Sequence, residues 1–139
     1  MFSDLDKQML ALRLDTALDY FYKKQADNLP SNKIILTNKI EAYCKCGPKA
    51  TPGGHVSWCI IVSNVIVPEA ERNQGVFSYF LEQMIRMTKE KGFPVYIESV
   101  ITPELMGYLK KRPEQFRPYH GPSEYVIEGQ IEHFIHLHE

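Results

Sequence analysis

The chain has 139 residues, 44% of them hydrophobic, and a formal net charge of −1. This length predicts one domain, residues 1–139, with an ordinary core, and the balanced charge disfavours nucleic acid and anionic membranes as partners. No run approaches the roughly 20 apolar residues of a membrane span, and the N-terminus lacks the pattern of a secretory signal. Three cysteines, an odd number, fit a reducing compartment. We therefore expect a cytoplasmic protein.

A helix is predicted near the N-terminus. Ser3 or Asp4 can cap its first turn, because short polar side chains accept hydrogen bonds from the unpaired N–H groups there. The apolar residues that follow recur on one helical stripe: Leu10, Leu14, Ala17, Leu18 and Phe21. We expect the helix to end before the polar stretch at residues 23–33.

Three strands are expected next. Residues 34–36 and 40–46 are short stretches that we interpret as strands. Glycines and prolines indicate a turn-rich connection over residues 47–54. Residues 56–67 are almost continuously apolar, which indicates a strand buried on both faces.

The second half of the sequence predicts helices alternating with strands. A helix over residues 75–91 precedes Gly92 and has one apolar face, made of Phe77, Phe80, Leu81, Met84 and Thr88. Residues 94–100 form the next strand, and Thr102 with Pro103 starts a helix that stops near Arg112. A hairpin is expected from residues 116–120 and 125–130, with 131–137 prolonging it. This order predicts an α/β (α+β) fold, a mixed sheet with a parallel pair in the middle.

An anion site is predicted where the long apolar strand is followed by a helix. Residues 67–78 read Val-Pro-Glu-Ala-Glu-Arg-Asn-Gln-Gly-Val-Phe-Ser. The first turn of a helix offers unpaired N–H groups and a partial positive charge, which suit a phosphate or pyrophosphate. Gly75 lets the backbone come close, and Arg72 can add a bidentate contact. A loop without function remains the alternative for so short a pattern.

The spacing Arg-x-x-Gly-x-Phe, preceded by Val-x-Val-Pro, resembles motif A of the Gcn5-related N-acetyltransferase family, which wraps the pyrophosphate of acetyl-coenzyme A. The resemblance covers roughly the last two thirds of the chain: residues 58–67 resemble the family's fourth strand, 75–91 its third helix, 94–100 its fifth strand and 102–112 its fourth helix. Phe77 replaces the motif's final small residue, and one extra residue lies between Pro68 and Arg72. The family's usual first strand is missing, so the N-terminal region is shortened.

The resemblance implies an acyltransferase that uses acetyl-coenzyme A as acyl donor and a primary amine as acceptor, a small molecule or a protein. It also implies that two groups hold the cofactor. Val65 and Val67 would pair through their backbone with pantetheine, and the pyrophosphate would be held by Arg72, Asn73, Gln74, Gly75, Val76, Phe77 and Ser78.

Four residues are candidates for catalysis. Members of the family often carry a glutamate on the fourth strand, but here that stretch offers only Ser63 and Asn64. They could orient a water or the substrate; the alternative is a bulge or a hydrogen-bonded polar group in the core. Glu98 is unexpected in a strand that should be apolar. Its burial would raise its pKa toward that of a general base, although an ion pair would explain it equally well. Tyr108 resembles the family's proton donor to the leaving thiolate, and an ordinary core position is the alternative.

A metal site is disfavoured. The spacing of Cys44, Cys46, His55 and Cys59 is poor for zinc, and His133, His136 and His138 suggest a polar strand edge or a frayed tail. The alternative function is a binding or assembly module of the same fold with weak or no catalysis, and an unrelated phosphate-binding domain is a third possibility. Apolar alternation at residues 131–137 permits a homodimer.

Overall fold

The computed structural model describes residues 1–100, 103–119 and 132–138. In these residues one mixed sheet has the strand order β1-β2-β3-β4-β6-β5. Its strands are β1 (Ser31–Leu36), β2 (Glu41–Ala50), β3 (Val56–Ile66), β4 (Val95–Val100), β5 (Arg117–Pro118) and β6 (Glu132–His136). β3 and β4 run parallel and the other neighbours antiparallel, which confirms the mixed sheet with a parallel pair in the middle.

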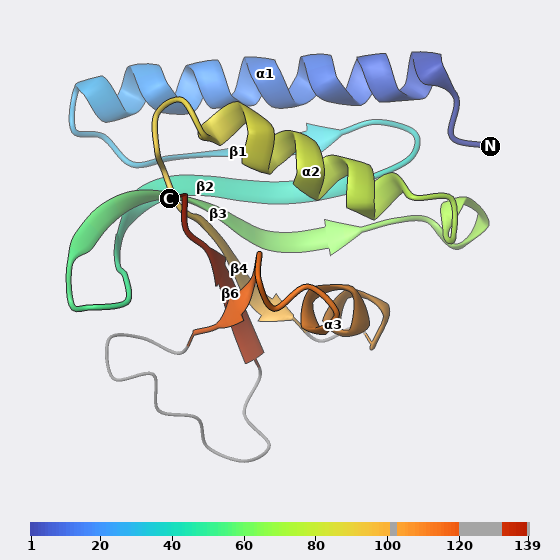
Figure 1. Ribbon diagram of the computed structural model, residues 1–139. Coiled ribbons are helices and arrows are strands. Elements are labelled where there is room, and N and C mark those ends of the chain that lie inside the picture. Colours follow the sequence, from blue (N-terminus) through green and yellow to red (C-terminus); the bar gives the residue numbers. More distant parts are fainter. Residues whose placement is uncertain (101–102, 120–131, 139) are drawn as a thin grey trace.

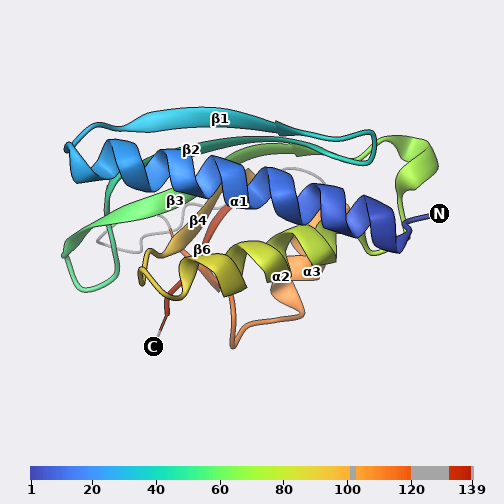
Figure 2. The ribbon, with the colours of Figure 1, turned by 90° about the horizontal axis from the view of Figure 1, so that it is seen from above.

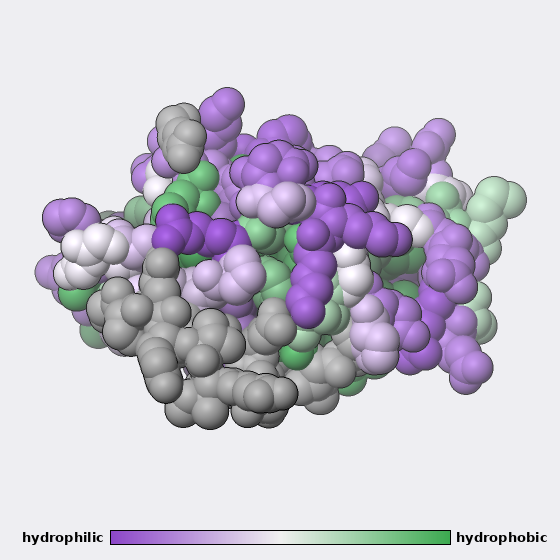
Figure 3. All heavy atoms as spheres, turned by 60° about the horizontal axis from the view of Figure 1, so that its bottom comes forward, coloured by the Kyte–Doolittle hydropathy of each residue, from purple (hydrophilic) through white to green (hydrophobic). Residues whose placement is uncertain are grey.

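The helices are α1 (Asp4–Ala26), α2 (Val76–Thr88) and α3 (Pro103–Lys110), with a short 3₁₀ helix η1 (Glu69–Glu71). α1 and α2 lie side by side on one face of the sheet, and α3 lies near the end of β4 (Figures 1 and 2). The main core fills the space between the sheet and α1 and α2, while a smaller cluster around Cys59, Tyr96 and Tyr119 occupies the other face. On that other face, hydrophobic side chains reach the surface between hydrophilic ones (Figure 3). No described helix has the length and apolarity of a membrane span.

The predicted start of α1 is confirmed and its predicted end is wrong. Ser3 is the cap: its hydroxyl accepts from the Asp6 N–H at 3.1 Å, and the Asp6 carboxylate accepts from the Ser3 N–H at 2.9 Å. The predicted apolar stripe is buried. The helix continues to Ala26, because lysines in its last turn suit the negative end of the helix dipole.

The turn predicted at residues 47–54 is shorter in the structure. Gly47 and Pro48 belong to β2, where Pro48 pairs with Trp58. β1 begins at Ser31, opposite Cys46, so beyond Cys46 β2 has β3 as its only described neighbour. A proline that lacks an N–H therefore costs no hydrogen bond on that side, and the chain turns only at residues 51–55.

Burial of β3 on both faces is restricted to residues 59–62, and toward its end exposed and half-buried residues alternate. The register with β2 shifts here: Val62 lies opposite Cys44 and Asn64 opposite Tyr43, so β3 has one extra residue, a bulge. The bulge leaves Ser63 without a direct partner on β2. This confirms the bulge alternative for Ser63, whereas Asn64 is paired with Tyr43.

The described C-terminal strand lies inside the sheet. β6 pairs with β4 on one side and β5 on the other, so the expected polar edge for the histidines is wrong. His136 contacts the Gln115 carbonyl oxygen at 2.7 Å, and His138 contacts the Thr88 hydroxyl at 2.9 Å. The predicted strand at 125–130 and the predicted cap Thr102 lie outside the described residues.

Candidate functional site

A cavity opens where the parallel strands separate. β3 and β4 are paired from Ile60 and Val95 to Val62 and Ile97, and the described residues beyond these points show no further pairing between the two strands. Figure 1 shows the two strands diverging from this point. The cavity between them has a volume of about 470 Å³. It is bounded by the last part of β3, the loop before α2, the first turn of α2, β4 and α3.

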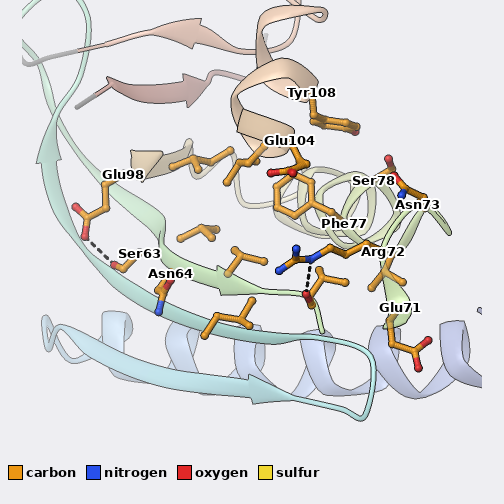
Figure 4. A pocket seen from close by; sticks show the side chains of 18 residues that line it. Ser63, Asn64, Glu71, Arg72, Asn73, Phe77, Ser78, Glu98, Glu104 and Tyr108 are labelled. Atoms are coloured by element: carbon orange, nitrogen blue, oxygen red, sulfur yellow. Dashed lines mark hydrogen bonds between the residues drawn. The ribbon is translucent and has the colours of Figure 1, made fainter. Parts of the chain in front are cut away.

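The cavity brings together nearly all the residues predicted for the site. Its lining includes Ser63, Asn64, Val65, Val67, Arg72, Asn73, Gly75, Val76, Phe77, Ser78, Glu98 and Tyr108. Gln74 does not line it: its side-chain nitrogen donates to the Ala70 carbonyl at 3.3 Å, which ties the loop to itself. Residues from four separate stretches of the sequence therefore share one cavity, drawn in Figure 4.

The first turn of α2 offers unpaired donors to this cavity. Gly75 is the residue before the helix and has φ +80°, a conformation that glycine adopts without strain. No side chain caps the turn, so the N–H groups of Val76, Phe77 and Ser78 have no partner inside the helix. A Cβ at Gly75 would meet nothing within 4 Å. The helix start is therefore accessible from the cavity, as an anion site requires.

Arg72 adds a positive charge beside these donors. Its Nε donates to the Val67 carbonyl oxygen at 3.1 Å. The guanidinium points into the cavity, between the end of β3 and the start of α2 (Figure 4). The contact with Val67 holds the Nε side of the guanidinium in place. The terminal nitrogens remain directed at the cavity, an arrangement suited to a phosphate oxygen.

Tyr108 on α3 stands at the same end of the cavity. Its ring meets the Phe77 ring edge-on at 5.4 Å and is covered by the Arg112 guanidinium at 3.7 Å. Burial raises the pKa of the Tyr108 phenol above its ordinary value, and the positive Arg112 and a hydrogen bond with Ser78 oppose that rise in part. The phenol is therefore protonated at neutral pH, as a proton donor must be. Phe77 therefore packs against one side of the Tyr108 ring.

Glu98 and Ser63 meet at the other end of the cavity. The Ser63 hydroxyl donates to the Glu98 carboxylate at 2.7 Å, and Lys45 Nζ donates to the same oxygen at 2.9 Å. Burial raises the pKa of Glu98, but hydrogen bonds from Lys45 and Ser63 and the charge of Lys49 outweigh it, so the pKa lies below its ordinary value. The expectation of a raised pKa is thus wrong, because the ion-pair alternative is present.

The cavity also contains residues that sequence reasoning missed. They are Val62, Ile66, Glu71, Ile97, Glu104 and Leu105. Glu71 forms a salt bridge with Lys39 at 2.8 Å. Glu104 lies in the first turn of α3, where an acidic residue is ordinarily explained by the helix dipole. For this reason the sequence alone does not mark Glu104 as a residue of the site.

The cysteines show no metal-binding arrangement. Cys44, Cys46 and Cys59 are buried free thiols, and burial raises their pKa to about 12, 12 and 11, respectively. Cys59 belongs to the small cluster on the face opposite that of the other two. Among the residues that the structure describes, no group of three or more potential metal ligands lies together.

Comparison with solved structures identifies a similar fold. The chain resembles a point mutant of the toxin AtaT, solved bound to the C-terminus of the antitoxin AtaR and to acetyl-coenzyme A, with a TM-score of 0.53. The match covers 86% of this chain and 75% of that chain, at 7% sequence identity. This chain has a Gcn5-related N-acetyltransferase fold. At such low identity the likeness shows the fold alone.

Comparison at the level of sequence finds nothing. The sequence matches no protein-family model, and no curated protein matches it. The likeness to known proteins therefore lies in the arrangement of the helices and strands.

Proposed function

We propose that the protein is an N-acyltransferase that moves an acetyl or other short acyl group from coenzyme A to a primary amine. The observation that carries the proposal is the cavity between the diverging strands β3 and β4, with Arg72 and the start of α2 at one end. A similar fold binds acetyl-coenzyme A in the AtaT structure. Backbone donors and a guanidinium suit the pyrophosphate, and the exposed edge of β3 near Val65 and Val67 would pair with pantetheine.

In the proposed reaction the amine nitrogen attacks the thioester carbonyl carbon, a C–N bond forms and the C–S bond breaks. Tyr108 gives its proton to the leaving thiolate, the amine gives up one proton to water, and the Tyr108 phenolate regains a proton from water. Ser63 and Asn64, at the bulge of β3, would orient the amine. Holding both reactants in one cavity supplies much of the rate enhancement. The contacts of Glu98 with Lys45 and Ser63 favour a structural role for that carboxylate.

Turnover against a panel of primary amines tests the proposal. Tyr108→Phe should lower kcat at least about tenfold, equivalent to about 1.4 kcal/mol of transition-state stabilisation, with little change in KM for acetyl-coenzyme A. Tyr22→Phe is the matched control, because the buried Tyr22 hydroxyl has no hydrogen-bond partner among the described residues. Equal kcat for wild type and Tyr108→Phe would contradict the assigned role of Tyr108.

One observation favours a second candidate function, a binding module that keeps the cofactor without catalysis. β3 contributes no carboxylate to the cavity, and Glu98 has a lowered pKa and is already paired, so neither provides a strong general base. This candidate predicts that the wild type binds acetyl-coenzyme A and turns over none of the amines.

A further inference from the structure

A salt bridge joins the connection between β1 and β2 to the loop that precedes α2. Lys39 Nζ lies 2.8 Å from a Glu71 carboxylate oxygen and 3.9 Å from the Asp6 carboxylate. The three side chains are only 12%, 21% and 20% exposed, respectively. One lysine therefore pairs with two carboxylates, and one of these, Glu71, lines the cavity.

The neighbours of Lys39 hold it in place. The Asp6 carboxylate also accepts from the N–H and hydroxyl of Ser3, so Asp6 is fixed to the start of α1. The Lys39 N–H donates to the Thr37 hydroxyl at 3.1 Å, which fixes the turn that carries the lysine. The hydrogen bond with Glu71 raises the pKa of Lys39 above its ordinary value, so the lysine is charged at neutral pH.

The position of Glu71 gives this salt bridge a consequence for the cavity. Glu71 directly precedes Arg72 in the sequence and lines the cavity with it. Figure 4 shows the Glu71 carboxylate pointing toward α1, away from the Arg72 guanidinium. Without Lys39, this carboxylate could turn to Arg72 and compete with an anionic ligand, or repel that ligand directly.

We propose that Lys39 is a positioning residue for the cofactor site: it holds Glu71 toward α1 and so keeps Arg72 and the first turn of α2 available to a pyrophosphate. The inference rests on the proposed function. This positioning role differs from a purely structural role for Lys39, in which the salt bridge only holds the loop against α1. In a structural role the charge of Glu71 would not matter once the salt bridge is lost.

Calorimetric titration with acetyl-coenzyme A separates these roles in the wild type and three variants: Lys39→Met, Glu71→Gln and the double variant. Lys39→Met should weaken binding about tenfold at low salt, and this loss should shrink at high salt. Glu71→Gln should bind as tightly as the wild type or more tightly. The double variant should return to within about threefold of the wild type, because the carboxylate that Lys39 restrains is then absent.

If Lys39→Met does not fold, a further variant can test the same salt bridge. Glu71→Asp shortens the side chain by one methylene group, which lengthens its contact with Lys39, and leaves the lysine and its contact with Asp6 in place. It should weaken binding in the same direction as Lys39→Met, while circular dichroism shows a folded protein.

The outcomes distinguish the inference from the proposed function. If the wild type does not bind acetyl-coenzyme A, the proposed function fails and the inference falls with it. If the wild type binds, two results overturn the inference alone. One is unchanged binding by both Lys39→Met and Glu71→Asp, and the other is a double variant as weak as Lys39→Met.

Discussion

At the scale of single residues, Glu98 shows how its neighbours determine the state of a carboxylate in a buried strand. From sequence, burial argues for a raised pKa and a general base. In the structure Lys45 and Ser63 donate to the carboxylate, and the pKa lies below its ordinary value of 4.5. Both partners lie far from residue 98 in sequence, so the direction of the shift could not be predicted without the fold.

This lowered pKa predicts how stability depends on pH. Glu98→Gln should lower the free energy of unfolding by about 1–2 kcal/mol at pH 7, because it removes the charge that Lys45 pairs with. Since the folded-state pKa is depressed, the wild type's advantage is present above about pH 4.5. It is lost as the pH falls through the folded-state pKa. Urea unfolding of both proteins between pH 3 and pH 7 checks this, and a constant difference would contradict it.

At the scale of elements, the proposed anion site lies at the start of α2. Gly75 and Gly92 both have positive φ, +80° and +73°, and a Cβ at either would meet nothing within 4 Å. Only Gly75 borders the cavity. The two glycines are therefore a matched pair, alike in backbone conformation and different in distance from the site.

Replacing each glycine by alanine separates stability from binding. Gly75→Ala and Gly92→Ala should each lower the free energy of unfolding by about 1–2 kcal/mol, because alanine is strained at positive φ. Only Gly75→Ala should also weaken binding of acetyl-coenzyme A, since its methyl group would take up open space that borders the cavity. Thermal unfolding and calorimetry measure both effects. Equal binding by the two variants would argue against an anion at the start of α2.

Elements with a clear local pattern could be predicted from sequence. The Ser3 cap, the buried stripe of α1, and four of the five residues expected on the buried face of α2 are confirmed. The fifth, Phe77, is half-buried and faces the cavity. Elements whose limits depend on neighbouring strands were mispredicted, as at Pro48, because an edge without a partner is visible only in the assembled sheet.

At the scale of the whole molecule, the site depends on an opening between two strands. The resemblance to motif A singled out the residues from Arg72 to Ser78, and all of them except Gln74 line the cavity. Glu71 and Glu104 have ordinary explanations in the sequence, so nothing local singled them out. Their proximity to the site comes from the separation of β3 and β4 and from the position of α3.

The central claim is that this opening binds an acyl-coenzyme A, and calorimetric titration with acetyl-coenzyme A tests it most directly. The wild type should bind. Arg72→Ala should bind at least about tenfold more weakly, because this variant lacks the guanidinium that would contact the pyrophosphate. Arg86→Ala is the matched control: Arg86 is an exposed arginine of α2 that contacts Gln83 and does not line the cavity. It should bind as the wild type does. No binding by the wild type at millimolar ligand, or equal affinity for wild type and Arg72→Ala, would contradict the account.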